Sequence, residues 1–338
     1  MMGDRFDYDC DLAIIGAGMA GMSAALFAAN RGLSTLQCGS SSGLMFASGM
    51  LDVLAIYPVE KKRRWDNPWA AIDYLKQSER KHPYTRIPRE LIDKSLQELL
   101  IFFENNRFPY HFSKGNNALL PTGQGTVKPS YLVPRSMWQG VIALSGRKPC
   151  VLIDFAGMKE FSAHQVTESL KTFWPDLRSV QVIFPGMEKQ LEVHPEHMAR
   201  ALENEDNRTA LAGRLAEHIK NETFVGLPAV LGMRHHIQIL ERLEKDLGVS
   251  IFEIPTPAVS VSGMRLKEFF ERHLPDKGVV QLSNSKVSAW ERLNDGRFLI
   301  QVRHRDMSSV VRCKGIILAS GKFFGGGLRA HRQGIRET

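Results

Sequence analysis

Hydrophobic and polar positions near the start of the chain change from a strand pattern to a helical one and back again. Residues 11–15 form a short apolar run that ends in a glycine, which is typical of a buried parallel strand. An Ala- and Leu-rich stretch over 22–31 predicts a helix, and Gly32 suits the position just after its end. A second apolar run over 33–38 predicts another strand. This order predicts a parallel βαβ unit.

The middle of the chain mixes helical and strand patterns. Residues 90–106 are patterned as a helix, and short apolar strands are predicted within 148–157 and 222–232. The amphipathic stretch 193–220 also predicts a helix. We therefore expect an α/β cap or substrate domain here, inserted into the N-terminal unit.

From Gly278 onward the chain alternates between apolar and polar residues, as strands do. The dipeptide Asp295-Gly296 is a hairpin signal between two such strands. An apolar run over 315–318 predicts a final buried strand that returns to the first sheet. The whole pattern predicts a Rossmann-like α/β domain with a β-meander, made of residues 1–57 and 278–338, and an inserted domain over 58–277.

Composition and charge narrow the possible functions. The chain has 338 residues, 43% of them apolar and 24% charged, enough for one large or two medium domains. No apolar run reaches the roughly 18 residues of a membrane span, and the acidic N-terminus lacks the apolar segment of a secretory signal. We expect a cytoplasmic protein, or one held at a membrane by a partner. The net charge of +8 comes without a basic stripe carrying aromatic residues, which argues against nucleic-acid binding.

The spacings of histidines, cysteines and serines do not indicate a metal site or a hydrolase active site. The pairs His194 and His197, and His235 and His236, do not match a zinc motif, and no G-x-S-x-G sequence is present. The 4 cysteines are far apart and show no C-x-x-C spacing: Cys10, Cys38, Cys150 and Cys313. We expect no metal site, so electrons passing through the protein would need an organic cofactor.

A glycine-rich turn, GAGMAG, follows the first predicted strand. Gly16, Gly18 and Gly21 occupy the three glycine positions of G-x-G-x-x-G. In this motif the first glycine turns the chain, the second lets the backbone approach a phosphate, and the third allows the helix to pack closely on the strand. The free N–H groups at the helix N-terminus then face the anion. The motif lies between a strand and a helix, and it therefore predicts a nucleotide-type site.

The second strand departs from this motif at its end. A carboxylate that binds the ribose hydroxyls is expected about 20 residues after the first glycine. Residues 38–40 read Cys-Gly-Ser there, and none of them carries a carboxylate. The ligand could lack adenosine, as FMN does; it could be FAD or NAD with the ribose held otherwise; or the site could be empty. Gly39 would suit the close approach of a phosphate end, which favours FMN.

Several ordered segments resemble the B-type subunits of the anaerobic, quinone-linked glycerol-3-phosphate dehydrogenase. They cover nearly the whole chain: IIGAGMAG (14–21), MFASGMLDVL (45–54), HPY (82–84), LPTGQGTVKPSYLVP (120–134), GLPAVLGM (226–233), IPTPAVSVSGMRL (254–266) and ILASGKFFGGGLRAHRQGIRE (317–337). The resemblance implies a Rossmann-like flavin-binding domain of the FAD/NAD(P)-binding type, with FMN as its flavin and FAD as the alternative.

The resemblance also implies partners and a reaction. A partner subunit would carry FAD and oxidise sn-glycerol 3-phosphate to dihydroxyacetone phosphate. An iron–sulfur subunit would anchor the complex at the inner face of the cell membrane and pass electrons to menaquinone. This chain would be a flavin-bearing oxidoreductase subunit with no membrane span of its own.

Motif matching assigns residues to the flavin but identifies no catalytic acid or base. The expected cofactor-binding residues are Gly16, Gly18, Gly21, Gly39, Ser42, Ser48, Gly49, Ala319, Ser320 and Gly321. Members of the resembled family run on beyond the position of Thr338, into a segment expected to embrace the flavin. Two other functions therefore stay open: an assembly subunit, or a truncated product, that binds no flavin, and a separate FAD- or NAD-dependent reductase.

Overall fold

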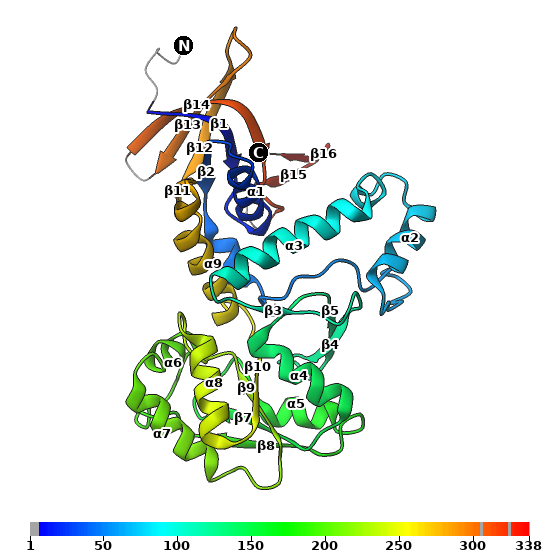
Figure 1. The fold of residues 1–338 in the computed structure, drawn as a ribbon, viewed down its shortest axis with the longest axis vertical. Coiled ribbons are helices and arrows are strands. Elements are labelled where there is room, and N and C mark those ends of the chain that lie inside the picture. Colours follow the sequence, from blue (N-terminus) through cyan, green and yellow to red (C-terminus); the bar gives the residue numbers. More distant parts are fainter. Residues whose placement is uncertain (1–6, 305–306, 324–325, 338) are drawn as a thin grey trace. The chain divides into compact units, whose positions relative to one another are not determined.

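The computed structural model describes residues 7–304, 307–323 and 326–337 (Figure 1). The chain forms two compact units, one of Met1–Phe46 with Met264–Thr338 and one of Ala47–Gly263. The second unit therefore begins and ends earlier along the chain than the insertion expected over residues 58–277. Residues 47–57 join the second unit because Leu51 and Leu132 exchange backbone hydrogen bonds of 3.0 and 2.9 Å.

The first unit, here called the sheet unit, is built on a six-stranded sheet of order β11-β2-β1-β14-β13-β12. Strands β11, β2, β1 and β14 run parallel to one another. Strand β13 pairs with β14 in antiparallel fashion, and β12 pairs with β13 in the same way. The strands are β1 Tyr8–Ile15, β2 Thr35–Gly39, β11 Val280–Ser283, β12 Lys286–Arg292, β13 Phe298–His304 and β14 Met307–Leu318. This arrangement confirms the predicted Rossmann-like α/β fold with its meander.

Helix α1, Met19–Asn30, packs on β1 and β2 and joins them as the βαβ pattern predicted. The sheet unit also contains the short helices η1 (Ser41–Phe46) and η3 (Pro275–Lys277), most of α9 (Val261–His273), and the two-stranded ribbon of β15 (Leu328–His331) and β16 (Gly334–Glu337). The predicted hairpin joins β12 to β13. Its turn contains Gly296 at φ +84° and the Asp295 carboxylate, which accepts a hydrogen bond of 3.0 Å from the Arg297 N–H.

The second unit, here called the insert unit, contains a four-stranded parallel sheet of order β10-β9-β7-β8. Every residue of β7 and β9 is buried, as expected for strands covered on both faces. Helices α4, α5 and α8 pack against this sheet. The elements are α4 Arg135–Gly146, β7 Cys150–Phe155, α5 Ala163–Leu170, β8 Leu177–Val182, α6 Pro195–Ala201, α7 Glu205–Ala216, β9 Phe224–Pro228, α8 His236–Leu247 and β10 Ser250–Ile254.

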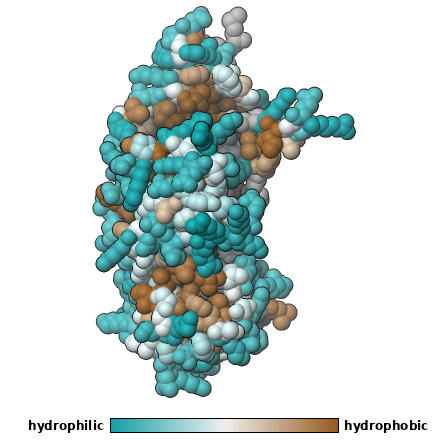
Figure 2. Space-filling view, turned by 90° about the vertical axis from the view of Figure 1, so that its right-hand side faces the viewer, coloured by the Kyte–Doolittle hydropathy of each residue, from teal (hydrophilic) through white to brown (hydrophobic). Residues whose placement is uncertain are grey.

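The remainder of the insert unit precedes that sheet in the chain. It consists of α2 Pro68–Ser78, η2 Pro83–Thr85, α3 Arg89–Asn105, β3 Tyr110–His111, β4 Ala118–Pro121, β5 Val127–Ser130 and β6 Val133–Pro134. The face drawn in Figure 2 is mostly hydrophilic, and apolar side chains gather on it in a few patches.

The stretch 193–220, which the sequence predicts to be helical, forms two helices with a short break between them. The chain leaves α6 after Ala201, and Asn204 begins α7. The Asn204 side chain accepts hydrogen bonds from the backbone N–H groups of Asp206 (2.8 Å) and Asn207 (3.3 Å). A side chain that caps a new helix N-terminus in this way ends the preceding helical run.

Candidate functional site

The predicted glycine turn lies between β1 and α1, at the carboxyl end of the parallel strands. Gly16 has φ +127°, and its N–H donates a 2.7 Å hydrogen bond to the Cys38 carbonyl on β2. A Cβ atom at Gly16 would lie 2.0 Å from the Ala319 carbonyl oxygen, just beyond β14. Ala319 in turn donates to the Ile15 carbonyl at 2.7 Å. Only glycine fits here, because both the conformation and the space exclude a side chain.

Gly21 brings α1 close to this turn. A Cβ atom at Gly21 would lie 2.0 Å from the Gly16 carbonyl oxygen. The same carbonyl accepts a 3.2 Å hydrogen bond from the amide of Gln37, which is buried on β2. The glycine turn is therefore held by the helix on one side and by the neighbouring strand on the other.

Gly18 differs from the other two glycines, because nothing lies within 4 Å of the Cβ it would carry. It occupies the N-cap position of α1 with extended backbone, φ −81° and ψ −176°, and no side chain caps the helix. The first turn of α1 contains no acidic residue. The first N–H groups of a helix have no acceptor within it, so this end of α1 can receive an anion. The three glycines form a cradle that fits the phosphate end of a flavin nucleotide.

The end of β2 contains no carboxylate, and its backbone explains why. Gly39 has φ +145°, and its Cβ would lie 3.0 Å from both the Ala17 nitrogen and the Gly16 Cα atom. An acidic side chain at this position would be strained and crowded against the glycine turn. The Gly39 N–H instead donates to the Ser285 hydroxyl at 3.1 Å.

Replacing Ser285 with alanine should loosen the end of β2. Ser285 is buried, and its hydroxyl also donates to the Leu282 carbonyl at 2.5 Å. Without this side chain the Gly39 N–H loses its acceptor, at a cost of about 1–2 kcal/mol. Hydrogen exchange at β2 and β11 should therefore be faster in Ser285→Ala than in the wild type. The exposed Ser288→Ala is the matched control, and equal exchange in both variants would contradict this role.

The other predicted site residues are distributed over both units. Ala319 contacts the glycine turn directly, and Ser320 and Gly321 follow it just beyond β14. Ser42 lies in η1, and its side chain is outside the described part of the chain. Ser48 and Gly49 belong to the insert unit, where the Gly49 carbonyl accepts a 2.6 Å hydrogen bond from the Tyr110 hydroxyl. Flavin contacts at these residues, as at Gly16, Gly18, Gly21 and Gly39, stay predictions.

The cysteines take no part in this site as thiolates. Burial, with a smaller contribution from Cys313, raises the pKa of Cys10 to about 12. Burial likewise raises the pKa of Cys38 to about 12 and that of Cys313 to about 11. These side chains stay protonated and pack in the core of the sheet unit. Within the described residues, no group of His, Cys, Asp and Glu side chains is arranged to hold a metal ion.

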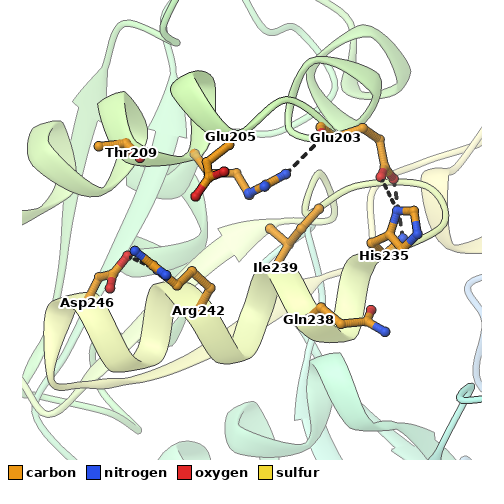
Figure 3. Close-up of a pocket in the computed structure, with 9 residues that line it drawn as sticks. Glu203, Glu205, Thr209, His235, Gln238, Ile239, Arg242 and Asp246 are labelled. Atoms are coloured by element: carbon orange, nitrogen blue, oxygen red, sulfur yellow. Dashed lines mark hydrogen bonds and ion pairs between the residues drawn. The ribbon is translucent and has the colours of Figure 1, made fainter.

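The insert unit contains a pocket of about 310 Å³ between α7 and α8 (Figure 3). Two pairs of its polar side chains contact each other: Glu203 with His235 at 2.6 Å, and Arg242 with Asp246 at 2.8 Å. The Glu203 carboxylate also accepts 2.8 Å hydrogen bonds from the N–H groups of Met233 and Arg234. This network holds the start of α8, and sequence spacing alone did not connect Glu203 with the histidines.

Protonation of Glu203 should account for part of the loss in folding stability at low pH. Burial by itself would raise the pKa of this carboxyl, but the hydrogen bonds from Arg234, His235 and Met233 lower it from 4.5 to about 2. The ionised group therefore stabilises the fold fully above pH 4.5, and this stabilisation is lost as the pH falls towards about 2.

The variant Glu203→Gln should test this pH dependence. At pH 7 its free energy of unfolding should be about 1–3 kcal/mol lower than that of the wild type, because charge-assisted hydrogen bonds are lost. The difference should shrink as the pH falls from 4.5 to about 2. Urea unfolding across this range is the measurement, with the exposed Glu217→Gln as control. A difference independent of pH would contradict the assignment.

The glycine cradle, set between a parallel strand and a helix in a sheet of order β11-β2-β1-β14, defines a dinucleotide-binding fold. Over residues 11–338 the chain matches the model of the FAD binding domain family, and it belongs to that family. Flavin is therefore the class of cofactor that this domain takes.

The resemblance to the glycerol-3-phosphate dehydrogenase B subunits is confirmed by curated relatives. The chain is 27% identical to the B subunit of the anaerobic glycerol-3-phosphate dehydrogenase of Vibrio vulnificus, over 97% of this chain and 76% of the relative. It is 29% identical to the probable B subunit of the same enzyme from Halobacterium salinarum, over 97% of this chain and 78% of the relative.

A solved structure, the 3-ketosteroid Δ1-dehydrogenase of Sterolibacterium denitrificans, aligns over 93% of this chain and 48% of that one, with 14% identity and a TM-score of 0.40.

Among the described residues of our chain, no helix has the length and apolar character needed to cross a membrane.

Proposed function

We propose that this chain is a flavin-containing subunit of a glycerol-3-phosphate dehydrogenase complex and that its flavin is FAD. The observation that carries the proposal is the cradle of Gly16, Gly18 and Gly21, which leaves an uncapped helix N-terminus open to a phosphate. The similarity to the B subunits of that enzyme over 97% of the chain supports the reaction class.

The choice of FAD differs from the FMN that the sequence favoured. A family model for an FAD binding domain matches residues 11–338, which supports the larger flavin. When bound, the flavin supplies the ability to accept and pass on electrons. The chain's own residues bind it: the cradle receives the pyrophosphate, while β1, β2 and β14 fix the cradle in place.

The partners and the location belong to the same proposal. A second subunit containing FAD oxidises sn-glycerol 3-phosphate to dihydroxyacetone phosphate, and an iron–sulfur subunit passes electrons to menaquinone. This chain lies on the cytoplasmic side and reaches the inner face of the membrane through those subunits. The naming of the relatives as B subunits supports the existence of other subunits.

The proposal is tested on the complex purified through a tag on this chain. Anaerobic addition of sn-glycerol 3-phosphate should bleach the visible flavin absorbance, and sn-glycerol 1-phosphate should not. The flavin content should match occupancy of this chain as well as of the catalytic partner. A complex that is bleached but contains flavin only in the partner would give this chain an assembly role alone. Bleaching by neither phosphate would contradict the reaction.

A further inference from the structure

The absence of an acid at the end of β2 leaves the ribose of an FAD without its usual partner. We propose that Glu271, on α9, supplies this carboxylate and binds the ribose hydroxyls of the adenosine. The inference rests on the proposed function, since it concerns how the same site holds FAD. The observation behind it is a 2.6 Å hydrogen bond from the Ser41 hydroxyl, just beyond β2, to Glu271 Oε1.

The topology of the sheet brings Glu271 to this position. Strand β11 follows α9 along the chain and pairs in parallel with β2, with Val280 opposite Leu36 and Ser283 opposite Gly39. The chain therefore returns from α9 to the sheet directly beside the strand whose acid is missing. Ser41 and Glu271 are 230 positions apart in the sequence, so no local motif reveals their contact.

Neighbouring side chains hold the carboxylate while leaving it accessible. Glu271 Oε2 accepts a 2.8 Å hydrogen bond from the Lys267 ammonium, one turn earlier on α9. Ser41 is buried, whereas the Glu271 side chain is 26% exposed. A carboxylate offers about four acceptor positions, so those not used by Ser41 and Lys267 remain for the two ribose hydroxyls.

The conformation of Gly39 explains why the acid comes from another element. A side chain at Gly39 would be strained at φ +145° and would press on the glycine turn. A carboxylate delivered from α9 avoids this strain. The fold thus separates two tasks that one strand end normally combines: β2 packs against the cradle, and α9 supplies the charge.

Flavin affinities measure this role without relying on enzyme activity. The dissociation constants of FAD and FMN are determined by quenching of flavin fluorescence on the purified full chain. Glu271→Gln should weaken FAD binding by roughly ten- to a hundredfold, because hydrogen bonds to a charged group are lost. It should leave FMN binding unchanged, since FMN has no adenosine ribose.

The control is Glu291→Gln, which makes the same chemical change on β12, at the opposite edge of the sheet. It should bind FAD as the wild type does. Unchanged FAD affinity in Glu271→Gln, or an equal loss for FMN, would overturn the ribose assignment while leaving the cradle intact. A wild-type chain that binds neither flavin would overturn the proposed function itself, and the ribose assignment with it.

A second measurement is made on the wild-type chain, so its result does not depend on how the substitution affects folding. ADP and 2′-deoxy-ADP compete with FAD on the wild-type chain, and the deoxy compound should compete about tenfold more weakly. In Glu271→Gln this difference should largely disappear. Equal competition by the two nucleotides on the wild type would contradict a carboxylate at the ribose.

Discussion

Gly18→Asp should abolish flavin binding while leaving the protein folded. A Cβ atom at this position meets nothing within 4 Å, and the backbone at φ −81° accepts any residue, so the fold has no reason to change. The carboxylate would stand at the open end of α1, where the phosphate is expected. Repulsion between like charges a few ångströms apart should weaken FAD binding by at least about a hundredfold. Fluorescence titration with FAD measures this loss.

Two control variants separate charge from general damage. Gly18→Ala adds only a methyl group in open space and should weaken FAD binding far less than the aspartate does. Gly213→Asp adds the same charge at an exposed position of α7, in the insert unit, and should bind FAD normally. Undiminished affinity in Gly18→Asp would contradict the assignment of the phosphate to the cradle.

Gly21→Ala should destabilise the sheet unit more than an alanine usually does in a helix. Alanine normally favours a helix interior, but this Cβ would lie 2.0 Å from the Gly16 carbonyl oxygen. Because that atom belongs to the backbone, α1 and the glycine turn must separate. We expect a loss of about 3 kcal/mol in the free energy of unfolding, together with weaker FAD binding. Urea denaturation followed by circular dichroism measures the loss.

A glycine in another helix provides the comparison with the opposite sign. Gly213 lies within α7, where nothing would contact an added Cβ. Gly213→Ala should raise stability by about 0.5–1 kcal/mol, because the unfolded chain loses conformational freedom. If Gly21→Ala were as stable as Gly213→Ala, the close packing of α1 on the turn would be wrong.

Local sequence patterns predicted the part of the fold that forms the cradle. Gly16, Gly18 and Gly21 lie where a strand, a tight turn and a helix follow one another, so their roles depend on near neighbours. The contact between Gly16 and Ala319 could also be predicted, because the final apolar strand was expected to return to this sheet.

Contacts between distant segments could not be read in the same way. The Ser41–Glu271 hydrogen bond and the Gly39–Ser285 hydrogen bond each join residues more than two hundred positions apart. They depend on β11 pairing with β2 after the whole insert unit, which no periodicity reveals. The break between α6 and α7 was missed for a different reason: Asn204 is polar and fits an exposed helical position as well as an N-cap.

The most direct test of the account is the identity of the flavin that the purified chain retains. The protein is incubated with equal amounts of FAD and FMN and freed of excess ligand, and its absorbance spectrum is recorded. Acid then releases the bound flavin for chromatography. The account predicts the absorbance bands of oxidised flavin and release of FAD. A colourless protein would contradict a flavin-containing subunit, and release of FMN would contradict both FAD and the role of Glu271.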